Sequence, residues 1–528
     1  MKIDSVAVLG GGPGGLYAAR LFKRTYPQAT VTVHEQSTPE ATFGFGVAIA
    51  SRTQRNLEAA DPATLDDMLA AGRPHDVRMV VDDAQSRVHN GALIGIGRAT
   101  LLEILSRHAV EAGVEIRYGR RAALADLRGG PDAADLVIVA DGVSSQTRTE
   151  HAADLGAHVE VAGGLYLWAG TDVALDTAVF APVTTAHGTF VIHAYPYSAD
   201  RSTFLVETDE ATWRAAGFDA TTEATPSDAS DTTSLDYLAD AFAEHLGGRR
   251  LIGNRTRWLR FRTVHCDRWT RGNAVLLGDA AHTAHYSVGS GTKLAMEDAI
   301  ALHDAVLAAP DLGAAFVAYE RERRPQVERL QELARRSRLW WDSFPQRTHL
   351  PVDQLMVAYM TRTGNVSLPR FAGTNPDVVR RGLAHYAGVD ADAVPLDGVV
   401  DWVLSRPLEH GGCRWDTRLV DGDRLPAGLA RVEVDLTDPW GEAGDALVKH
   451  LHDLTLRGRQ GFRLTGADER GAVLTRLDVG ERLRAETGAL VVVDGPATAL
   501  GELASGLASG RTDLVCVTDT DSDPGDLR

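Results

Sequence analysis

Cysteine, lysine and long apolar runs are scarce in this sequence. The 528 residues contain three cysteines, Cys266, Cys413 and Cys516, which lie far apart and form no CxxC pair. This spacing excludes a disulfide framework, a thiolate zinc ribbon and an iron–sulfur cluster, so we expect structural thiols and no metal site. No run reaches the roughly 18 apolar residues that a membrane span needs. The N-terminus has no signal-peptide pattern, so we expect a cytoplasmic protein that does not enter a membrane.

Positive charge is in the minority and is carried almost entirely by arginine. The chain has 54 basic and 72 acidic residues, a net charge of −18, and only four lysines. This balance argues against general binding to nucleic acid or to anionic membranes. Eight arginines nevertheless lie between residues 249 and 271, where some alternate with apolar residues in WLRFRTV. The alternation predicts a strand with one basic face, which is either a solvated surface or a binding face for phosphate groups.

The length and the order of the expected elements predict several domains. At about 150 residues per domain, the chain is long enough for about two to four. Residues 1–160 alternate between strand and helix, and this α/β pattern returns at 266–375, so the two ranges are expected to form one domain. Short alternating runs at 161–265 predict an inserted antiparallel sheet that serves as a substrate domain. Residues 376–528 are expected to form a separate, small α/β region.

A glycine-rich turn follows the first expected strand. Gly10, Gly12 and Gly15 form the pattern GxGxxG, with Gly14 inside it, between a strand and a helix. Glycine permits the tight turn, the close approach of a pyrophosphate to the backbone, and the close packing of helix on sheet. Glu35 ends the second strand 20 residues after Gly15, where a carboxylate can accept hydrogen bonds from a ribose diol. The pattern therefore predicts a Rossmann-like fold that binds a dinucleotide.

The downstream sequence distinguishes FAD from NAD as this dinucleotide. The expected strand 274–277 ends in Gly278-Asp279, and a helix opens after a loop that contains Gly289, Gly291 and Thr292. An aspartate at such a strand end can bind the ribityl hydroxyls of a flavin, and a glycine loop at a helix N-terminus can stabilise negative charge on the reduced ring. An NAD enzyme requires neither feature, so FAD is predicted.

Three motifs together resemble the class A FAD-dependent aromatic hydroxylases, which are single-component monooxygenases. These motifs are GGGPGGLYAARLF, VADGVS and LLGDAAH. Two longer stretches, FGFGVAIASRT and GDAAHTAHYSVGSGTKLAMEDAIAL, are more narrowly similar to the group of salicylyl-CoA 5-hydroxylase and 2-aminobenzoyl-CoA monooxygenase. The resemblance implies that FAD contacts the following residues: Gly10, Gly12, Gly14, Gly15, Glu35, Arg98, Asp279, Gly289, Gly291 and Thr292.

The resemblance also implies a reaction. NADH or NADPH would reduce FAD, O2 would add at flavin C4a, and the hydroperoxide would hydroxylate an electron-rich ring. The narrow group implies salicylyl-CoA, hydroxylated para to its phenol, and Arg257 and Arg260 would then bind the CoA phosphates. Other functions remain open at this point: hydroxylation of 2-aminobenzoyl-CoA, of a free aromatic acid or of an indole, or a flavin-binding scaffold without hydroxylase activity.

The loop after Asp279 departs from the broad family. The proline that is usual there is absent, which leaves His285 and Tyr286 near the expected flavin face. Both are candidate catalytic residues, because a histidine with an ordinary pKa near 6.5 suits proton transfer from a phenol. An orienting or packing role for His285 is the other interpretation.

The C-terminal region resembles the last βα units of an old-yellow-enzyme-type TIM barrel. It contains an expected strand at 489–493, an alanine-rich helix and an expected strand at 514–517. A complete barrel needs about 250 residues, more than this region has. Asp519, Asp521 and Asp523 would repel a flavin phosphate. The resemblance therefore implies a remnant reductase barrel, retained for folding or for contact in a homodimer.

Overall fold

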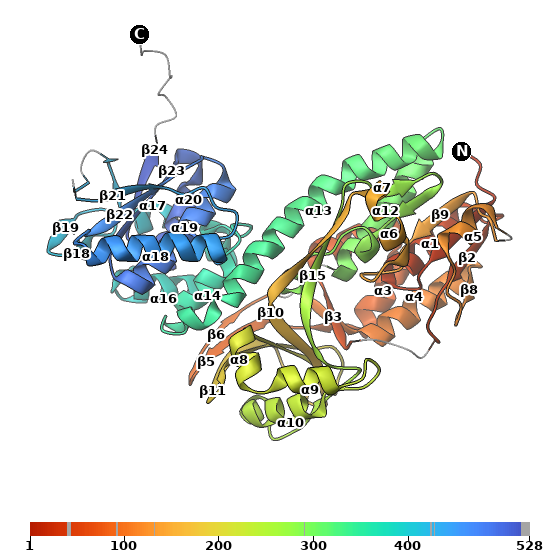
Figure 1. Ribbon diagram of the computed structural model, residues 1–528, viewed down its shortest axis with the longest axis horizontal. Helices are drawn as coiled ribbons and strands as arrows, with labels where there is room; N and C mark the ends of the chain where they lie inside the picture. The colour runs from red at the N-terminus through yellow and green to blue at the C-terminus, as the bar shows by residue number, and fades with distance from the viewer. Residues whose placement is uncertain are drawn as a thin grey trace, which may run out of the picture. The chain divides into compact units, whose positions relative to one another are not determined.

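The computed structural model describes residues 1–39, 44–90, 93–130, 132–289, 291–422, 425–426 and 428–518 (Figure 1). The backbone groups into two compact units: Met1–Arg78 with Asn90–Arg338, and Met79–His89 with Leu339–Arg528. Within the described ranges, no helix combines the length and apolarity that crossing a membrane requires. Compact units of the backbone need not coincide with functional domains. The expected division into residues 1–160, 161–265, 266–375 and 376–528 therefore stays a prediction.

The first unit contains a six-stranded, mainly parallel sheet. Its strands are β1 (Ser5–Leu9), β2 (Thr30–His34), β8 (Glu115–Arg117), β9 (Leu136–Val139), β16 (Thr270–Arg271) and β17 (Ala274–Leu276). They lie in the order β16-β17-β9-β1-β2-β8, and all neighbours are parallel except β16 and β17. The inner strands are apolar and almost wholly buried, as expected for a parallel sheet covered on both faces.

Helices pack against this sheet and against the antiparallel sheet described next. Those that lie wholly or mostly in the first unit are α1 (Pro13–Thr25), α2 (Ser51–Ala60), α3 (Pro62–Ala71), α4 (Arg98–Ala112), α5 (Leu124–Gly129), α6 (Gln146–Glu150), α7 (Ala152–Leu155), α8 (Glu210–Ala215), α9 (Phe218–Ala224), α10 (Thr232–Ala241), α11 (Ala243–Leu246), α12 (Gly291–Ala308) and α13 (Leu312–Asp342). Helix α1 packs against α4 and α12. A Cβ on Gly14 would lie 2.7 Å from Leu277 Cδ1 and 2.9 Å from Ala295 Cβ. Glycine at this position therefore lets α1 lie close to the end of β17 and to α12.

A second, antiparallel sheet is built from the chain between β9 and β17. Its strands there are β10 (Ala157–Thr171), β11 (Ala178–Thr185), β12 (Gly188–Pro196), β13 (Ser202–Thr208), β14 (Leu251–Ile252) and β15 (Trp258–Cys266). They lie in the order β14-β10-β13-β12-β11, and β15 also pairs with β10. Since β9 and β17 are neighbours, the chain leaves the parallel sheet and returns to it beside the same strand. The remaining strands before α4 are β3 (Gly46–Ile49), β4 (Arg73–Pro74), β5 (Val77–Val81), β6 (Ala84–Val88) and β7 (Ile94–Gly97).

The two faces of the antiparallel sheet differ in chemistry, because successive side chains of a strand point to opposite faces. One face is apolar: it includes Leu167 and Phe204, both fully buried, and Phe204 packs edge-on against Phe242 at 5.6 Å between ring centroids. The strand register places aromatic and polar side chains together on the other face, among them Tyr166, Trp168, His193, Tyr195, Thr203 and Glu207.

The second unit contains a five-stranded parallel sheet. Its helices are α14 (Val352–Thr361), α15 (Leu368–Thr374), α16 (Pro376–Ala387), α17 (Val399–Leu404), α18 (Glu442–Leu456), α19 (Arg470–Thr487) and α20 (Leu500–Ala508). Its strands are β18 (Leu408–His410), β19 (Cys413–Trp415), β20 (Leu419–Val420), β21 (Ala430–Glu433), β22 (Gly461–Thr465), β23 (Leu490–Pro496) and β24 (Leu514–Thr518). The sheet order is β20-β24-β23-β22-β21, and β18 pairs only with β19. The expected strands at 489–493 and 514–517 correspond to β23 and β24, whereas Asp519–Asp523 lie outside the described residues.

One face of this second sheet is covered by the short hairpin. Leu490 and Val492 of β23 and Leu514 of β24 form a small apolar cluster against which Leu408 and Trp415 pack. Helices α18, α19 and α20 connect β21, β22, β23 and β24 in turn (Figure 1). Each strand therefore pairs with the next one along the chain, as in consecutive βα units.

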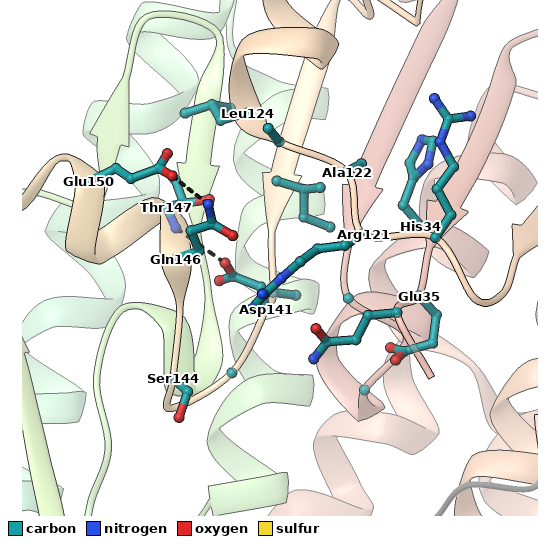
Figure 2. Close-up of a pocket in the computed structure, with 18 residues that line it drawn as sticks. His34, Glu35, Arg121, Ala122, Leu124, Asp141, Ser144, Gln146, Thr147 and Glu150 are labelled. Atoms are coloured by element: carbon teal, nitrogen blue, oxygen red, sulfur yellow. Dashed lines mark hydrogen bonds between the residues drawn. The ribbon is translucent and has the colours of Figure 1, made fainter. Parts of the chain in front are cut away.

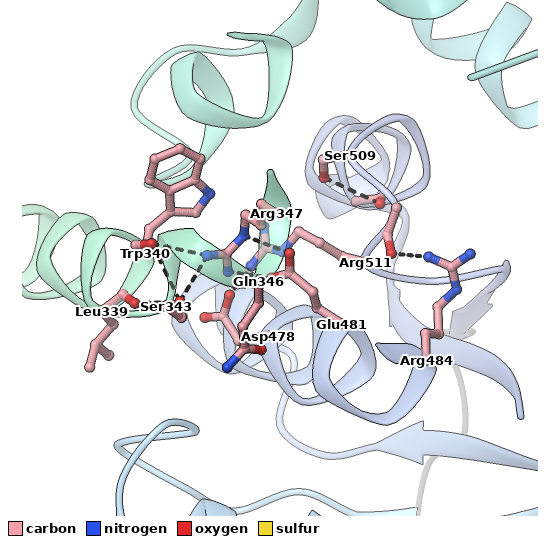
Figure 3. A network of polar contacts seen from close by, with 12 residues as sticks. Leu339, Trp340, Ser343, Gln346, Arg347, Asp478, Glu481, Arg484, Ser509 and Arg511 are labelled. Atoms are coloured by element: carbon pink, nitrogen blue, oxygen red, sulfur yellow. Dashed lines mark hydrogen bonds and ion pairs between the residues drawn. The ribbon is translucent and has the colours of Figure 1, made fainter. Parts of the chain in front are cut away.

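A buried polar network stabilises the second unit (Figure 3). Arg347, which is 2% exposed, donates from Nε and Nη2 to the carboxylate of Glu481 on α19, both at 2.6 Å. Its Nη1 donates to the Trp340 carbonyl oxygen at 2.9 Å. Arg484 donates to Asp513 at 2.8 Å, which fixes the end of α19 to the start of β24. Arg347 and Arg484 are thus each paired with a carboxylate of this unit.

Candidate active site

The glycine turn leaves the backbone open at the N-terminus of α1. Gly10 has φ +100°, and a Cβ there would lie 2.3 Å from the Ala140 carbonyl oxygen. A Cβ on Gly15 would lie 2.1 Å from the Gly10 oxygen, whereas one on Gly12 would meet nothing within 4 Å. Gly12 is the N-cap of α1, and it offers no side chain to cap the helix. The N–H groups and the positive end of the helix dipole therefore fit phosphate groups.

Glu35 follows β2 and is fixed beside this turn. Its carboxylate accepts hydrogen bonds from the backbone N–H groups of Gly11 and Ser37, both at 2.7 Å. Each carboxylate oxygen has more than one lone pair. Glu35 is therefore held in one orientation and can still accept hydrogen bonds from a ribose diol.

A pocket of about 240 Å³ adjoins the turn and is lined by Gly12, Glu35, Arg120, Arg121 and Asp141, among others (Figure 2). Figure 2 shows Arg121 extended toward Asp141. The sequence analysis did not single out either arginine. Both follow β8, whose end meets the end of β2 at the same sheet edge, and only the strand order shows this. The polar lining and the open glycine fit the adenosine half of a dinucleotide.

Arg98 and Asp279 lie close enough for their charges to interact. Burial lowers the pKa of Arg98 and raises that of Asp279, and the charge of each residue opposes the shift of the other. A Cβ on Gly291 would lie 3.9 Å from Asp279 Oδ1, so the start of α12, with Thr292, faces this carboxylate. Gly289, with φ +62°, turns the chain ahead of it. The structure thus brings these predicted flavin contacts together, while Ser290 lies outside the described residues.

A buried ion cluster behind this loop was not anticipated. Asp298 on α12 accepts hydrogen bonds from the Gly278 N–H at 2.9 Å and from Arg323 Nε at 2.8 Å, and its Oδ2 lies 2.8 Å from His282 Nε2. Burial raises the pKa of Asp298, but the charges of His282 and Arg323 outweigh it and bring the pKa to about 2. The ionised Asp298 therefore fixes the turn that carries Asp279. Its position in a long amphipathic helix gave no signal of this role.

His285 and Tyr286 stand in contact after this turn. Their ring centroids are 4.0 Å apart, and Phe261 packs edge-on against His285 at 4.8 Å. Burial lowers the pKa of His285 to about 3, with Arg338 and His193 adding to the effect and Glu207 opposing it. The ordinary histidine pKa near 6.5 therefore does not apply to this buried side chain, and His285 favours its neutral form. The geometry favours the orienting or packing interpretation.

A carboxylate and a histidine that the sequence analysis missed lie beside Tyr286. His193 Nε2 is 3.2 Å from Glu207 Oε2, and Tyr286 forms a hydrogen bond with Glu207. Tyr166 lies 4.9 Å from Tyr286 between ring centroids. His193 and Glu207 interrupt the apolar runs of β12 and β13, and the period of two in a strand was the signal that could have found them.

The structure does not bring Arg257 and Arg260 together on one face. Arg257 precedes β15 and donates to the Thr225 carbonyl oxygen at 2.9 Å. Arg260 lies on β15, pairs with Glu210 at 2.9 Å and also donates to the Gly163 carbonyl oxygen. A separation of three residues puts side chains on opposite sides of an extended chain. Arg257 lies before WLRFRTV, so the basic face expected from that segment includes Arg260 and Arg262 of β15 but not Arg257.

One group of side chains in the described part of the chain has a spacing compatible with a metal ion. His158, Glu160 and His265 offer ligand atoms within 4.8 Å of one another on the paired strands β10 and β15. His158 and Glu160 are exposed, and exposed ionisable groups commonly lie together without an ion. The absence of a metal stays a prediction.

Comparison with known proteins identifies relatives over nearly the whole chain. A family model described as FAD binding domain matches residues 4–334. Salicyloyl-CoA 5-hydroxylase from Streptomyces sp is 37% identical over 97% of this chain and 99% of its own length. A 3-hydroxy-4-methyl-anthranilyl-[aryl-carrier protein] 5-monooxygenase from Streptosporangium sibiricum is 38% identical over 69% of this chain and 95% of its own length.

Solved structures share the fold. The crystal structure of 2-methyl-3-hydroxypyridine-5-carboxylic acid oxygenase covers 72% of this chain and 97% of its own, with a TM-score of 0.55 and 22% sequence identity. The structure of PqsL from P. aeruginosa with 2-aminobenzoylacetate covers 64% of this chain and 96% of its own, with a TM-score of 0.51 and 23% identity. At these identities the likeness extends to the fold alone.

Proposed function

The chain belongs to the FAD-binding domain family, among the class A flavoprotein aromatic hydroxylases, and from this premise we propose that its substrate is salicyloyl-CoA. The observation that carries the proposal is the 37% identity to salicyloyl-CoA 5-hydroxylase over 97% of this chain and 99% of that protein. In the balanced reaction, the substrate, O2, NAD(P)H and a proton give the 5-hydroxylated thioester, NAD(P)+ and water. The new hydroxyl enters para to the existing phenol.

The predicted cofactor contacts have proposed roles that follow from their placement. Gly10, Gly12, Gly14 and Gly15 would let the pyrophosphate approach the start of α1, and Glu35 would bind the ribose diol. The other side of the cofactor would contact the following residues: Arg98, Asp279, Gly289, Gly291 and Thr292. When bound, FAD supplies hydride acceptance from NAD(P)H and activation of O2. The chain's own residues bind and orient the reactants and exclude water.

His285 and Tyr286 are proposed to orient the substrate ring. Their contact at 4.0 Å, with Phe261 against His285, makes an aromatic wall in which His285 is buried and the other two rings are half-buried. Such a wall excludes water from the reacting carbon and fixes the plane of an aromatic ring packed on it. A neutral His285 can hold Ser287, whose Oγ lies 3.0 Å from His285 Nδ1, and so fix the turn that carries Tyr286.

Arg257 and Arg260 remain proposed contacts of the CoA phosphates. Guanidinium groups bind phosphate well, and both residues lie near the antiparallel sheet that carries the aromatic wall. Arg260 would have to exchange Glu210 for a phosphate, whereas Arg257 donates to the Thr225 backbone carbonyl oxygen. Arg257 is therefore the better candidate of the two.

Residues 376–528 are proposed to be a remnant reductase barrel that supports folding or a homodimer. The successive parallel strands β21 to β24 support this proposal, because consecutive βα units build such barrels. Leu408 and Trp415 pack on the face that would line a barrel interior, which leaves little room for a cofactor there. Light scattering of the purified protein tests the homodimer.

Aerobic NADH consumption by the FAD-loaded protein tests the substrate. Salicyloyl-CoA, free salicylate and 2-aminobenzoyl-CoA are compared, and mass spectrometry identifies the products. We expect fast consumption and a product heavier by one oxygen with salicyloyl-CoA alone. Hydroxylation of free salicylate or of the amino thioester at an equal rate would replace the proposed substrate, and no stimulation by any of the three would remove it.

A further inference from the structure

The polar face of the antiparallel sheet contains a buried contact between a histidine and a carboxylate that the proposed function does not use. Glu207 on β13 and His193 on β12 lie with Oε2 and Nε2 3.2 Å apart, and their side chains are 12% and 9% exposed. Burying two ionisable groups together costs desolvation energy and is no reliable source of stability. The pair therefore calls for a functional explanation.

Glu207 is an anionic hydrogen-bond acceptor at this position. Burial raises the pKa of its carboxyl, but the charge of His193 and hydrogen bonds from His193 and Tyr286 outweigh burial and leave the pKa below its ordinary value. An ionised carboxylate accepts hydrogen bonds at both oxygens and donates none.

One of these oxygens is unsatisfied. Glu207 Oε1 is buried, and within the described part of the chain it accepts no hydrogen bond. A buried acceptor left without a donor costs about 1–3 kcal/mol in general, so most such atoms have a partner in the working state of a protein. A bound molecule with an O–H or N–H group would supply that partner. Tyr286, whose hydroxyl contacts the pair, is only half-buried, which gives a ligand access from its side.

The pair also lies near the predicted flavin contacts. Glu207 stands opposite Tyr166 in the register of β13 and β10, and Tyr166 is 4.9 Å from Tyr286 between ring centroids. Burial raises the pKa of Tyr166 to about 12, and the charge of Asp279 adds to the shift. Tyr166 therefore stands opposite Glu207 and also lies within range of the Asp279 charge.

We propose that Glu207, held by His193 and Tyr286, accepts a hydrogen bond from the ring hydroxyl of the aromatic substrate. This inference rests on the proposed function and adds the group that recognises the ring. A hydrogen bond to an anion draws the phenolic proton away from its oxygen and raises electron density at the para carbon, where the new oxygen enters. The same contact selects against rings without a donor, because the buried carboxylate would then stay unpaired.

Ligand binding to the FAD-loaded protein tests the proposal without turnover. The flavin absorbance change is titrated, without NADH, with salicyloyl-CoA and with benzoyl-CoA, which lacks only the hydroxyl. We expect the wild type to bind salicyloyl-CoA at least about tenfold more tightly than benzoyl-CoA, because the hydroxyl supplies a charge-assisted hydrogen bond. The ratio of the dissociation constant for benzoyl-CoA to that for salicyloyl-CoA is the quantity compared between variants. Glu207→Gln should reduce this ratio to about one to three, because an amide is a weaker acceptor.

Glu160→Gln is the matched control. It makes the same chemical change on the neighbouring strand β10, where Glu160 is 68% exposed, and it should keep the wild-type ratio. Equal binding of both thioesters by the wild type, or an unchanged ratio in Glu207→Gln, would overturn the proposal.

A second variant decides the matter if Glu207→Gln does not fold. His193→Gln removes the imidazole that holds Glu207 but leaves the carboxylate, and it should lower the ratio about threefold or more, whereas an unchanged ratio overturns the proposal. The same measurements separate a failure of the proposed function from a failure of this inference. A wild type that hydroxylates no thioester removes the substrate assignment, whereas hydroxylation with an unchanged ratio in the variants removes only the role of Glu207.

Discussion

The chain contains two parallel sheets whose strands are similarly apolar, but the surroundings of their strands differ. In the first unit, β1 and β9 end beside a glycine turn, an open space at Gly12 and a polar pocket of about 240 Å³. In the second unit, Asp494 on β23 is 3% exposed, and both its oxygens accept from Arg463 Nε, at 2.9 and 3.0 Å. Apolar strands therefore build a core in both units, and the glycine turn at the end of β1 is the feature that fits the first sheet for binding a phosphate.

Alanine substitutions at one glycine in each unit should give the largest contrast. A Cβ at Gly15 would lie 2.1 Å from the Gly10 oxygen, so Gly15→Ala should displace the turn and abolish FAD binding. Gly501 lies on α20 with nothing within 4 Å of an added Cβ. Gly501→Ala should keep full flavin content and add about 0.5–1 kcal/mol of stability. Absorbance at the flavin band checks both variants, and flavin retained in Gly15→Ala would break the comparison.

The next largest effect is expected at Asp298, which supports the turn behind Asp279. Asp298→Asn leaves Arg323 and His282 without their buried anion and should cost about 3–5 kcal/mol of unfolding free energy. The pKa of Asp298 falls from an ordinary 3.8 to about 2 on folding, because His282 and Arg323 outweigh the opposing effect of burial. Its contribution is therefore complete above pH 3.8 and is lost as the pH falls toward 2. Urea unfolding at pH 7 and pH 3 measures this, and a difference between wild type and variant that is as large at pH 3 as at pH 7 would contradict it.

Asp494 in the second sheet should affect stability alone. Asp494→Asn weakens the bond to Arg463 and should lower the free energy of unfolding by about 2 kcal/mol, with flavin content and NADH oxidation unchanged. Glu409→Gln is the control, since Glu409 is 75% exposed and pairs with the exposed Arg414, so a change within about 0.5 kcal/mol is expected. Loss of flavin from Asp494→Asn would show that the second sheet contributes to the cofactor site after all.

Sequence motifs predicted the parts of the site that depend on backbone. The turn at Gly10 to Gly15 and the placement of Glu35 after β2 follow from local chemistry, because only glycine fits the close approaches there. Asp279 was found in the same way, from a strand that ends in Gly-Asp. A short stretch of the chain determines by itself where these residues lie.

The missed residues depend on which strands become neighbours. Glu207 and His193 lie in separate strands, and their contact at 3.2 Å exists only because β12 pairs with β13 in one register. Asp298 becomes a support of the turn only when α12 packs against it. The lowered pKa of His285 could not be anticipated for the same reason, since burial by residues distant in the sequence sets it. Local pattern carries none of this information.

The arginines of the two units also differ in whether their guanidinium groups are paired with a carboxylate. Arg260 is paired with Glu210, as Arg463 is with Asp494, whereas Arg257 donates to a backbone carbonyl. Arg257→Ala should therefore raise the KM for salicyloyl-CoA about threefold to tenfold, and Arg260→Ala about twofold, because a partner must first be released. In both variants kcat should change little, since a phosphate contact is made equally in ground and transition states.

Arg250→Ala is the matched control for this smallest effect. Arg250 belongs to the same arginine-rich stretch, and it is 82% exposed and pairs with the exposed Asp236, so its loss removes the same charge without a proposed contact. Steady-state kinetics at two salt concentrations separate a contact from a general field, because screening weakens long-range attraction but leaves a close contact largely intact. An equal rise in KM for Arg250→Ala and Arg257→Ala would show that the arginine stretch attracts the substrate only through its general positive charge. A rise confined to Arg257→Ala would place one CoA phosphate beside the start of β15.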